Sequence, residues 1–498
     1  MDNLRFLDFY FPDKIKQSGF KRLWHFDCMY CLVTHGQTCD CCEYCTVDEE
    51  NVNKVHALQG LEFSPCNIRF FRWFGYPLDS LPSNFEVENL FALIMPWSKI
   101  KQLWNGLQHL EKLKHINLIH SKHLIRIPDL SLAPNLESLT LQGCTSLIEV
   151  HSSIQYLNKL VILNLKGCKS LNSLPANIQS KFLRYLILSS CSNLKKAPKI
   201  THSMENVCFD GTSITELSLI ENPPRPRCSY HGNCFWFYAV LNLRGCSKLH
   251  NWPQLLEKLS KLYALCLSEY MGQDVRGLRC PLVKSLMSLS EFDSYNWGIL
   301  GLPYTLDKFY SLNSLNLSRN NIEWIPPSLK QLKLGSLDVS YCERLKCLPL
   351  SALLIEAYNC ISLESCDFDL SSRVIAANFA NCLKLDQNML KANLGQQQCD
   401  MFKWRSLRQF LYPGNEIQEL FSFQNVGSSI TLEMPPLPPP KRFLGLKVCL
   451  VVTSQDQNKA PQYLDFCYKV IGIDENGKTL HENCVTLGFT RFENNSLM

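Results

Sequence analysis

The stretch from Leu136 to Pro175 contains one pattern of apolar residues twice. The second copy follows the first after 24 residues, and the matched positions are Leu136, Leu139, Leu141, Cys144 and Leu147, then Leu160, Leu163, Leu165, Cys168 and Leu171. A unit of this length is too short to bury its own apolar side. It must stack on a copy of itself, so the pattern predicts a solenoid in which each coil covers the next.

Within one unit, Leu163 and Leu165 alternate with Asn164. This period of two places both leucines on one face of a short strand, where each contributes about 1.5–3 kcal/mol when buried. Stacked strands form a parallel sheet, so we predict an α/β leucine-rich-repeat horseshoe with the sheet on its concave face. Return segments such as 173–178 are expected to be irregular or short helices. The residues predicted to face solvent on the inner curve are Val161, Ile162, Asn164, Lys166 and Gly167.

The repeat can be phased along most of the chain. One long step, between the strands starting at Met204 and Tyr238, contains Pro223, Pro224 and Pro226. These prolines favour a loop, because proline lacks the N–H that a ladder needs. The predicted strand starts are Ile68, Leu90, Leu113, Leu136, Leu160, Leu183, Met204, Tyr238, Leu262, Leu289, Leu312, Leu334, Ala352 and Val374.

The phased repeats divide the chain into segments. Leu7 and Phe9 already resemble a repeat strand, so we expect the chain to begin inside a solenoid, as a fragment, a truncated gene product or one half of something larger. After Leu385 the pattern is replaced by turns and alternating apolar residues, which are typical of a small β-sandwich. The predicted segments are the start of the repeats (1–16), a cysteine-rich insertion (17–53), the solenoid (54–385), a linker (386–403) and an all-β domain (404–498).

The compartment can be inferred from cysteine usage and charge. Neither a secretory signal nor an apolar run long enough to span a membrane is visible, so we predict reduced thiols and a cytoplasmic or nuclear location. The net charge of +5 comes with no basic stripe, so nucleic acid is not expected as the main partner. Of 25 cysteines, seven share one position of the repeat: Cys144, Cys168, Cys191, Cys246, Cys342, Cys360 and Cys382.

Another group of cysteines lies in the insertion, in the strings CMYC and CCEYC. Short spacing of this kind is typical of zinc sites, so zinc is the one cofactor that the sequence suggests. The other interpretation is an insertion whose cysteines are incidental. A zinc-dependent ubiquitin ligase is a function that such a site would allow. The candidate ligands are Cys28, Cys31, Cys39, Cys41, Cys42 and Cys45.

Long strings of the chain resemble a known family. The phased repeats, from IRFFRWFGYPLDSLP at 68–82 onwards, look like the repeat region of plant intracellular immune receptors of the TIR–nucleotide-binding–leucine-rich-repeat class. The string YPGNEIQELFSFQNVGSSITLEMP at 412–435 is similar to the start of the C-terminal jelly-roll/Ig-like domain of that class. The resemblance implies recognition of a pathogen effector or a guarded host protein by the concave surface together with the C-terminal domain.

The resemblance also bears on catalysis. No GxxxxGK[ST] phosphate loop occurs in this sequence, and no TIR-like region precedes its repeats. In the family those domains carry the nucleotide switch, NAD cleavage and oligomerisation. We therefore predict a non-catalytic binding module in plant defence. An extracellular leucine-rich-repeat receptor or inhibitor is the alternative.

Partner contacts are expected from side chains on the concave strands and their flanks. Exposed tyrosine and arginine are frequent energetic anchors of protein interfaces. The late repeats lie nearest the C-terminal domain in sequence, so the strongest anchors are predicted at Tyr263, Arg319 and Tyr341. The full candidate set is Lys114, His115, Arg184, Tyr185, Tyr263, Glu269, Arg319 and Tyr341.

Overall fold

A computed structural model of the chain divides into two compact units, Met1–Pro413 and Gly414–Met498. For the segment 6–9 and for the segments from 409 onwards, the description is of the backbone alone. The structure describes residues 6–9, 68–82, 85, 87–201, 204–218, 239–251, 262–269, 288–302, 309–349, 352–367, 374, 376–386, 409–411, 463–473 and 479–490.

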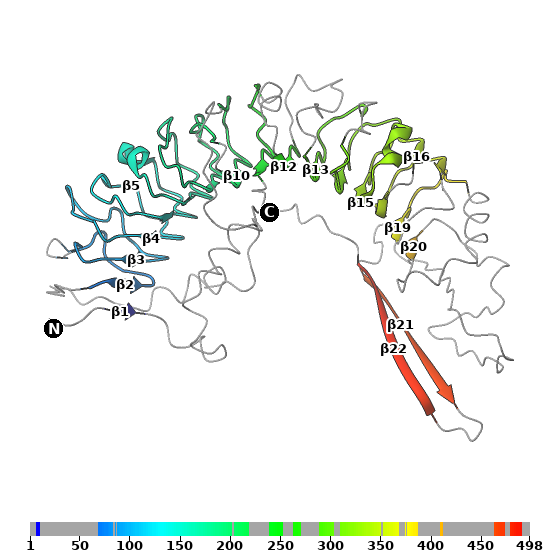
Figure 1. Ribbon diagram of the computed structural model, residues 1–498, viewed down its shortest axis with the longest axis horizontal. Coiled ribbons are helices and arrows are strands. Elements are labelled where there is room, and N and C mark those ends of the chain that lie inside the picture. Colours follow the sequence, from blue (N-terminus) through cyan, green and yellow to red (C-terminus); the bar gives the residue numbers. More distant parts are fainter. Residues whose placement is uncertain are drawn as a thin grey trace, which may run out of the picture. The chain divides into compact units, whose positions relative to one another are not determined.

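Strands of the first unit form one parallel sheet whose strand order follows the chain. Figure 1 shows the strands of this sheet, from β2 to β19, along the inner side of the coils. Each of these strands begins within two residues of a predicted start, which confirms the phasing. The strands are β1 (Phe6–Phe9), β2 (Phe70–Trp73), β3 (Ala92–Ile94), β4 (His115–Asn117), β6 (Ser138–Thr140), β8 (Ile162–Asn164), β9 (Tyr185–Ile187), β10 (Asn206–Cys208), β11 (Ala239–Asn242), β12 (Leu262–Cys266), β13 (Glu291–Asp293), β14 (Ser314–Asn316), β15 (Leu334–Asp338), β17 (Ala352–Glu356), β19 (Ala376–Asn378) and β20 (Gln409–Leu411).

The return segments lie on the outer side of the coils and carry little regular structure (Figure 1). Two short parallel pairs form there, β5 (Arg126–Ile127) with β7 (Glu149–Val150), and β16 (Cys347–Pro349) with β18 (Ser365–Asp367). Two single-turn 3-10 helices, η2 (Ser152–Tyr156) and η6 (Pro327–Gln331), complete the described return segments. The expectation of irregular or short helical returns is therefore confirmed.

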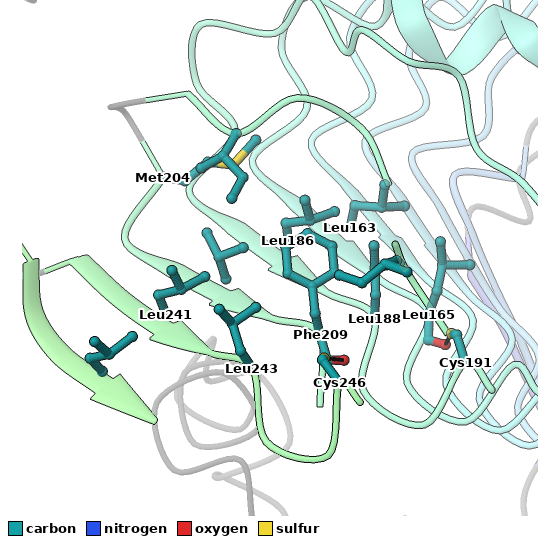
Figure 2. Close-up of a cluster of buried hydrophobic side chains, with 14 of the residues drawn as sticks. Leu163, Leu165, Leu186, Leu188, Cys191, Met204, Phe209, Leu241, Leu243 and Cys246 are labelled. Carbon is teal, nitrogen blue, oxygen red and sulfur yellow. Dashed lines mark hydrogen bonds between the residues drawn. The ribbon is translucent and has the colours of Figure 1, made fainter. Parts of the chain in front are cut away.

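Columns of leucine fill the space between the sheet and the returns. Leu163 is fully buried, and its strand pairs it with Leu139 of the preceding coil and Leu186 of the following one. Figure 2 shows Leu163 and Leu186 turned toward one interior, which Phe209 and Cys246 continue in later coils. Each coil therefore depends on its neighbours for the burial of its own apolar side chains.

The prediction that Asn164 faces solvent is wrong, because its side chain is only 3% exposed. Its Oδ1 accepts the N–H of Lys166 at 3.0 Å, and its Nδ2 donates to Gln142 Oε1 at 3.4 Å. Neighbouring strands lie about 4.8 Å apart, so side chains on the concave face cover one another. The same turn, in which a side-chain oxygen accepts the N–H two residues on, recurs at Asn117, Asn242, Asp293, Asn316, Asp338 and Asn378.

The seven repeat cysteines are free and buried in the turn after the strand. Cys168 Sγ donates to the carbonyl oxygen of Leu141 in the preceding coil at 3.2 Å, and the other six make the same contact. Asn320 holds this position in one coil. Its Nδ2 donates to the carbonyls of Ser294 and Leu317, and its Oδ1 accepts two backbone N–H groups. A cysteine thiol at this position offers one weak hydrogen bond in place of the several that the Asn320 amide makes.

Strand β20 extends the sheet beside β19, although sequence analysis assigns Gln409–Leu411 to the C-terminal domain. Alternating apolar residues suit a strand in either domain, and only the pairing with β19 distinguishes them. In the second unit, β21 (Tyr463–Ile473) and β22 (Thr479–Thr490) form an antiparallel hairpin. The sandwich stays a prediction.

We expect Leu163→Ala to lower the free energy of unfolding by about 2–5 kcal/mol, because the cavity would lie between stacked coils that cannot collapse into it. Lys169→Ala, at an exposed position beyond the same strand, should change it by less than about 0.5 kcal/mol. Urea denaturation followed by circular dichroism measures both. Equal losses in the two variants would show that the leucine column does not hold the coils together.

Burial raises the pKa of the Cys144 and Cys191 thiols to about 12. The thiolate is the reactive form, so both should resist maleimide in the native protein, whereas the exposed Cys347 should be modified. Peptide mapping after a short labelling pulse separates the sites. Labelling of Cys144 and Cys191 as fast as Cys347 without denaturant would contradict the burial of the column.

Candidate binding surface on the parallel sheet

The sheet face consists of the strand side chains that point away from the leucine core, together with two residues of the following turn. After β6, for example, these are Gln142 and Gly143, which come one residue beyond the strand. The second turn residue has a positive φ, as in Gly143 at +73°. At this position Glu269, Arg319 and Tyr341 have φ of 58°, 57° and 59°, a conformation that L-residues avoid. The N–H groups of all three donate to carbonyls of the next coil at 2.7–2.8 Å, which fixes them as a rigid edge.

Lys114 and His115 lie together on the early coils. Lys114 Nζ pairs with Glu137 Oε1 at 2.7 Å and lies 5.6 Å from the centroid of the Phe91 ring. His115 meets the same ring edge-on at 5.6 Å. Burial lowers the pKa of His115, and the nearby charge of Glu137 partly opposes this. The two predicted contact residues thus belong to one ordered cluster.

Arg184 and Tyr185 both bind one carboxylate of the next coil. Arg184 pairs with Glu205 Oε1 at 3.1 Å, and the Tyr185 hydroxyl donates to Glu205 Oε2 at 2.9 Å. Glu269 is held similarly, because Arg244 donates to both of its oxygens at 2.8 and 3.1 Å. The hydrogen bonds from Arg244 lower the pKa of Glu269.

In the later coils, three tyrosine rings and one guanidinium contact one another along the turns of successive coils. This row is here called the aromatic edge: Tyr295, Arg319, Tyr341 and Tyr358. The Arg319 guanidinium lies 4.2 Å from the centroid of Tyr341 and 5.8 Å from that of Tyr295. Tyr341 and Tyr358 meet edge-on at 5.3 Å. The structure therefore brings two predicted anchors, Arg319 and Tyr341, into contact. Tyr263 is half-buried near the start of β12, on another coil and away from this edge.

Beside the aromatic edge runs a second row, the acidic row, at one register position of successive strands: Asp293, Asn316, Asp338, Glu356 and Asn378. Asn378 Nδ2 donates to Glu356 Oε2 at 2.9 Å. Burial raises the pKa of Glu356 to about 7, and the neighbouring charge of Asp338 adds to this. Burial likewise raises the pKa of Asp338, against the N–H of Ser340.

Sequence analysis missed the acidic row and Tyr295 and Tyr358. A signal was present, because each of these residues recurs at a fixed distance from the repeat leucines. This spacing alone does not identify a site, because a half-buried carboxylate cannot be distinguished from a solvated one until its neighbours on adjacent coils are known. The predicted zinc ligands, Cys28, Cys31, Cys39, Cys41, Cys42 and Cys45, lie outside the described residues.

Three general features bear on chemistry. Within the described ranges, no group of three histidine, cysteine or acidic side chains is arranged to hold a metal ion. No helix among those residues is long and apolar enough to cross a membrane. What the sheet face presents is a continuous array of fixed polar, aromatic and charged side chains, suited to contact with another macromolecule.

The fold is that of a leucine-rich-repeat protein, and relatives can be named. No protein-family profile matches the chain. It is 31% identical over 521 residues to the Disease resistance-like protein DSC1 of Arabidopsis thaliana, covering 90% of this chain and 41% of that protein. It is 28% identical over 459 residues to the TMV resistance protein N of Nicotiana glutinosa, covering 80% and 40%. The chain is thus homologous to plant disease resistance proteins, which confirms the resemblance, and spans about two fifths of these relatives.

Solved structures give a weaker comparison. The Leptospira interrogans LRR protein LIC12759 aligns at 19% identity with a TM-score of 0.26, covering 55% of this chain and 90% of that one. An internalin (inlF) from Listeria monocytogenes aligns at 16% identity with a TM-score of 0.26, covering 68% and 88%. At such scores the comparison carries no argument about function.

We expect Glu356→Gln to stabilise the protein at pH 8 and to change little at pH 4. The folded pKa of about 7 exceeds the ordinary 4.5, so the folded state holds a proton that the unfolded state releases, and stability falls as pH rises between these values. The gain is on the order of 1 kcal/mol, reduced because the group keeps some solvent contact. Urea titrations at both pH values measure it. The exposed control Glu364→Gln should change stability little at either pH. Destabilisation by Glu356→Gln at pH 8 would contradict the raised pKa of Glu356.

Proposed function

We propose that this solenoid is the non-catalytic recognition module of a plant immune receptor, binding a pathogen effector or a guarded host protein through its sheet face. The observation that supports this most is the aromatic edge beside the acidic row on adjacent coils. Tyrosine and arginine held in one geometry lose little entropy on binding, which makes them effective anchors.

Homology supports the defence-related part of this proposal. The relatives are named for disease resistance, and one of them for resistance to TMV. Those names describe the relatives, and their transfer to this chain is our inference. A contribution of the C-terminal segment to binding, inferred from the family resemblance, belongs to the same proposal, as does a location inside the cell.

The test compares captures by the full chain from leaf extracts, with and without infection. The variant R319A/Y341A should lose its specific partner, since each anchor is worth about 2 kcal/mol or more, roughly a thirty-fold change in affinity. The control K169A/Y310A removes one basic and one tyrosine side chain at exposed positions outside the sheet face. It should capture that partner as the wild type does.

Equal capture by R319A/Y341A and the wild type would contradict binding through the aromatic edge. The purified chain should show neither ATP hydrolysis nor NAD loss. Either activity, if it persisted through purification, would contradict a non-catalytic role.

A further inference from the structure

Charge is divided unequally along the sheet face. On β2 to β11 and their turns, the face carries arginines and lysines together with a smaller number of carboxylates. Among the described residues from β12 to β19, Arg319 is the one basic residue on that face. The basic side chains of this face in the early coils are Arg72, Lys166 and Arg244, and Arg69, Lys114 and Arg184 directly precede early strands as Lys333 precedes β15. The acidic side chains of the late coils are Glu269, Glu291, Asp293, Asp338 and Glu356.

The carboxylates of the sheet face differ in their partners. Glu137 and Glu205 of the early coils, and Glu269 on the first of the late coils, are each paired with a cation on a neighbouring coil, at 2.7, 3.1 and 2.8 Å respectively. Across the part of the chain that the structure describes, Asp338 and Glu356 form no ion pair. Their described contacts are to neutral groups, the N–H of Ser340 and the amide of Asn378. These two carboxyl groups lie on adjacent strands, about 5 Å apart, and neither has a counter-ion among the described residues.

An exposed apolar side chain lies on the same strand as Glu356. Leu354 is 45% exposed on the sheet face of β17, two residues from Glu356. Its neighbours in register are small, Ser336 on one side and Ala376 on the other, so nothing on the sheet covers it. The patch thus combines an apolar floor, uncompensated carboxylates and the rigid rings of Tyr341 and Tyr358.

We propose that the sheet face of β13 to β19 is the docking site for a cationic protein segment, one that places lysine or arginine on the acidic row and an apolar side chain on Leu354. A cation supplies the counter-charge that the early coils find within the sheet. Nucleic acid phosphate would meet repulsion on this face. The inference rests on the proposed function and adds the chemistry of the partner.

The test uses a fluorescent peptide of about ten residues, alternating lysine and serine with one central leucine, and the full chain. Anisotropy should show saturable binding that weakens with added salt. D338N/E356Q should bind at least about ten-fold more weakly, because half or more of the charge contacts are lost. L354S should reduce affinity for this peptide, but not for the same peptide lacking leucine.

Controls separate the face from net charge. E343Q/E364Q removes two exposed carboxylates from the same coils outside the sheet face, and it should bind as the wild type does. A glutamate–serine peptide should not bind. Affinity for the lysine peptide should rise from pH 6 to pH 8 as Glu356 ionises, and this rise should be smaller in E356Q. Asp338 and Asn378 face Glu356 from the adjoining strands. Asp338 can only lose a proton as pH rises and Asn378 has none to lose, so neither opposes the gain of negative charge at Glu356.

Failure of this inference differs from failure of the proposed function. No binding of the lysine peptide, or equal weakening by D338N/E356Q and E343Q/E364Q, would overturn the cationic partner. Capture from leaf extract could still depend on Arg319 and Tyr341, and the recognition role would then stand. In the reverse result, the lysine peptide binds at the acidic row, but R319A/Y341A captures the same partner from leaf extract as the wild type does. That result would overturn only recognition through the aromatic edge, and the cationic docking site would stand.

Discussion

The stacking of one coil on the next is the constraint on which the whole structure depends. No coil can bury Leu163 or its equivalents alone, so each inner strand of the sheet is held between two neighbours, as β8 is between β6 and β9. This arrangement places side chains of successive coils about 4.8 Å apart on the sheet face. At that spacing each surface residue meets its equivalent in the next coil, and rows of interacting side chains result. The acidic row and the aromatic edge are two such rows.

The stacking of coils also explains why strand positions can be predicted from the sequence and surface contacts cannot. Strand positions follow from the leucines, because a one-residue error would turn Leu163 and Leu165 to solvent, and the phasing is accordingly confirmed across the sheet. The surface is different, because its geometry depends on pairs from separate coils. Asn164 was predicted to be solvated, yet neighbouring side chains cover it. Arg319 and Tyr341 could be named as anchors, but their contact with each other was not foreseeable from their spacing.

The turn after each strand links stability with recognition. A buried cysteine or Asn320 closes the turn from inside, and a residue with positive φ precedes it on the outside. Several coils place glycine there, and a Cβ at Gly143 would collide with the His120 ring. The coils that place Glu269, Arg319 or Tyr341 there instead accept an unfavourable backbone conformation. These side chains are then presented at fixed positions, which reduces the entropy lost when a partner binds.

Site-specific photo-crosslinking in plant tissue tests the central claim, recognition by the late sheet face, most directly. A photoreactive residue would replace Ser336, on the sheet face of β15, or Glu343, exposed on the same coil outside that face. We expect a covalent adduct with a partner protein from position 336 and none from position 343. Adducts from position 343 alone would show that the partner binds elsewhere on the solenoid.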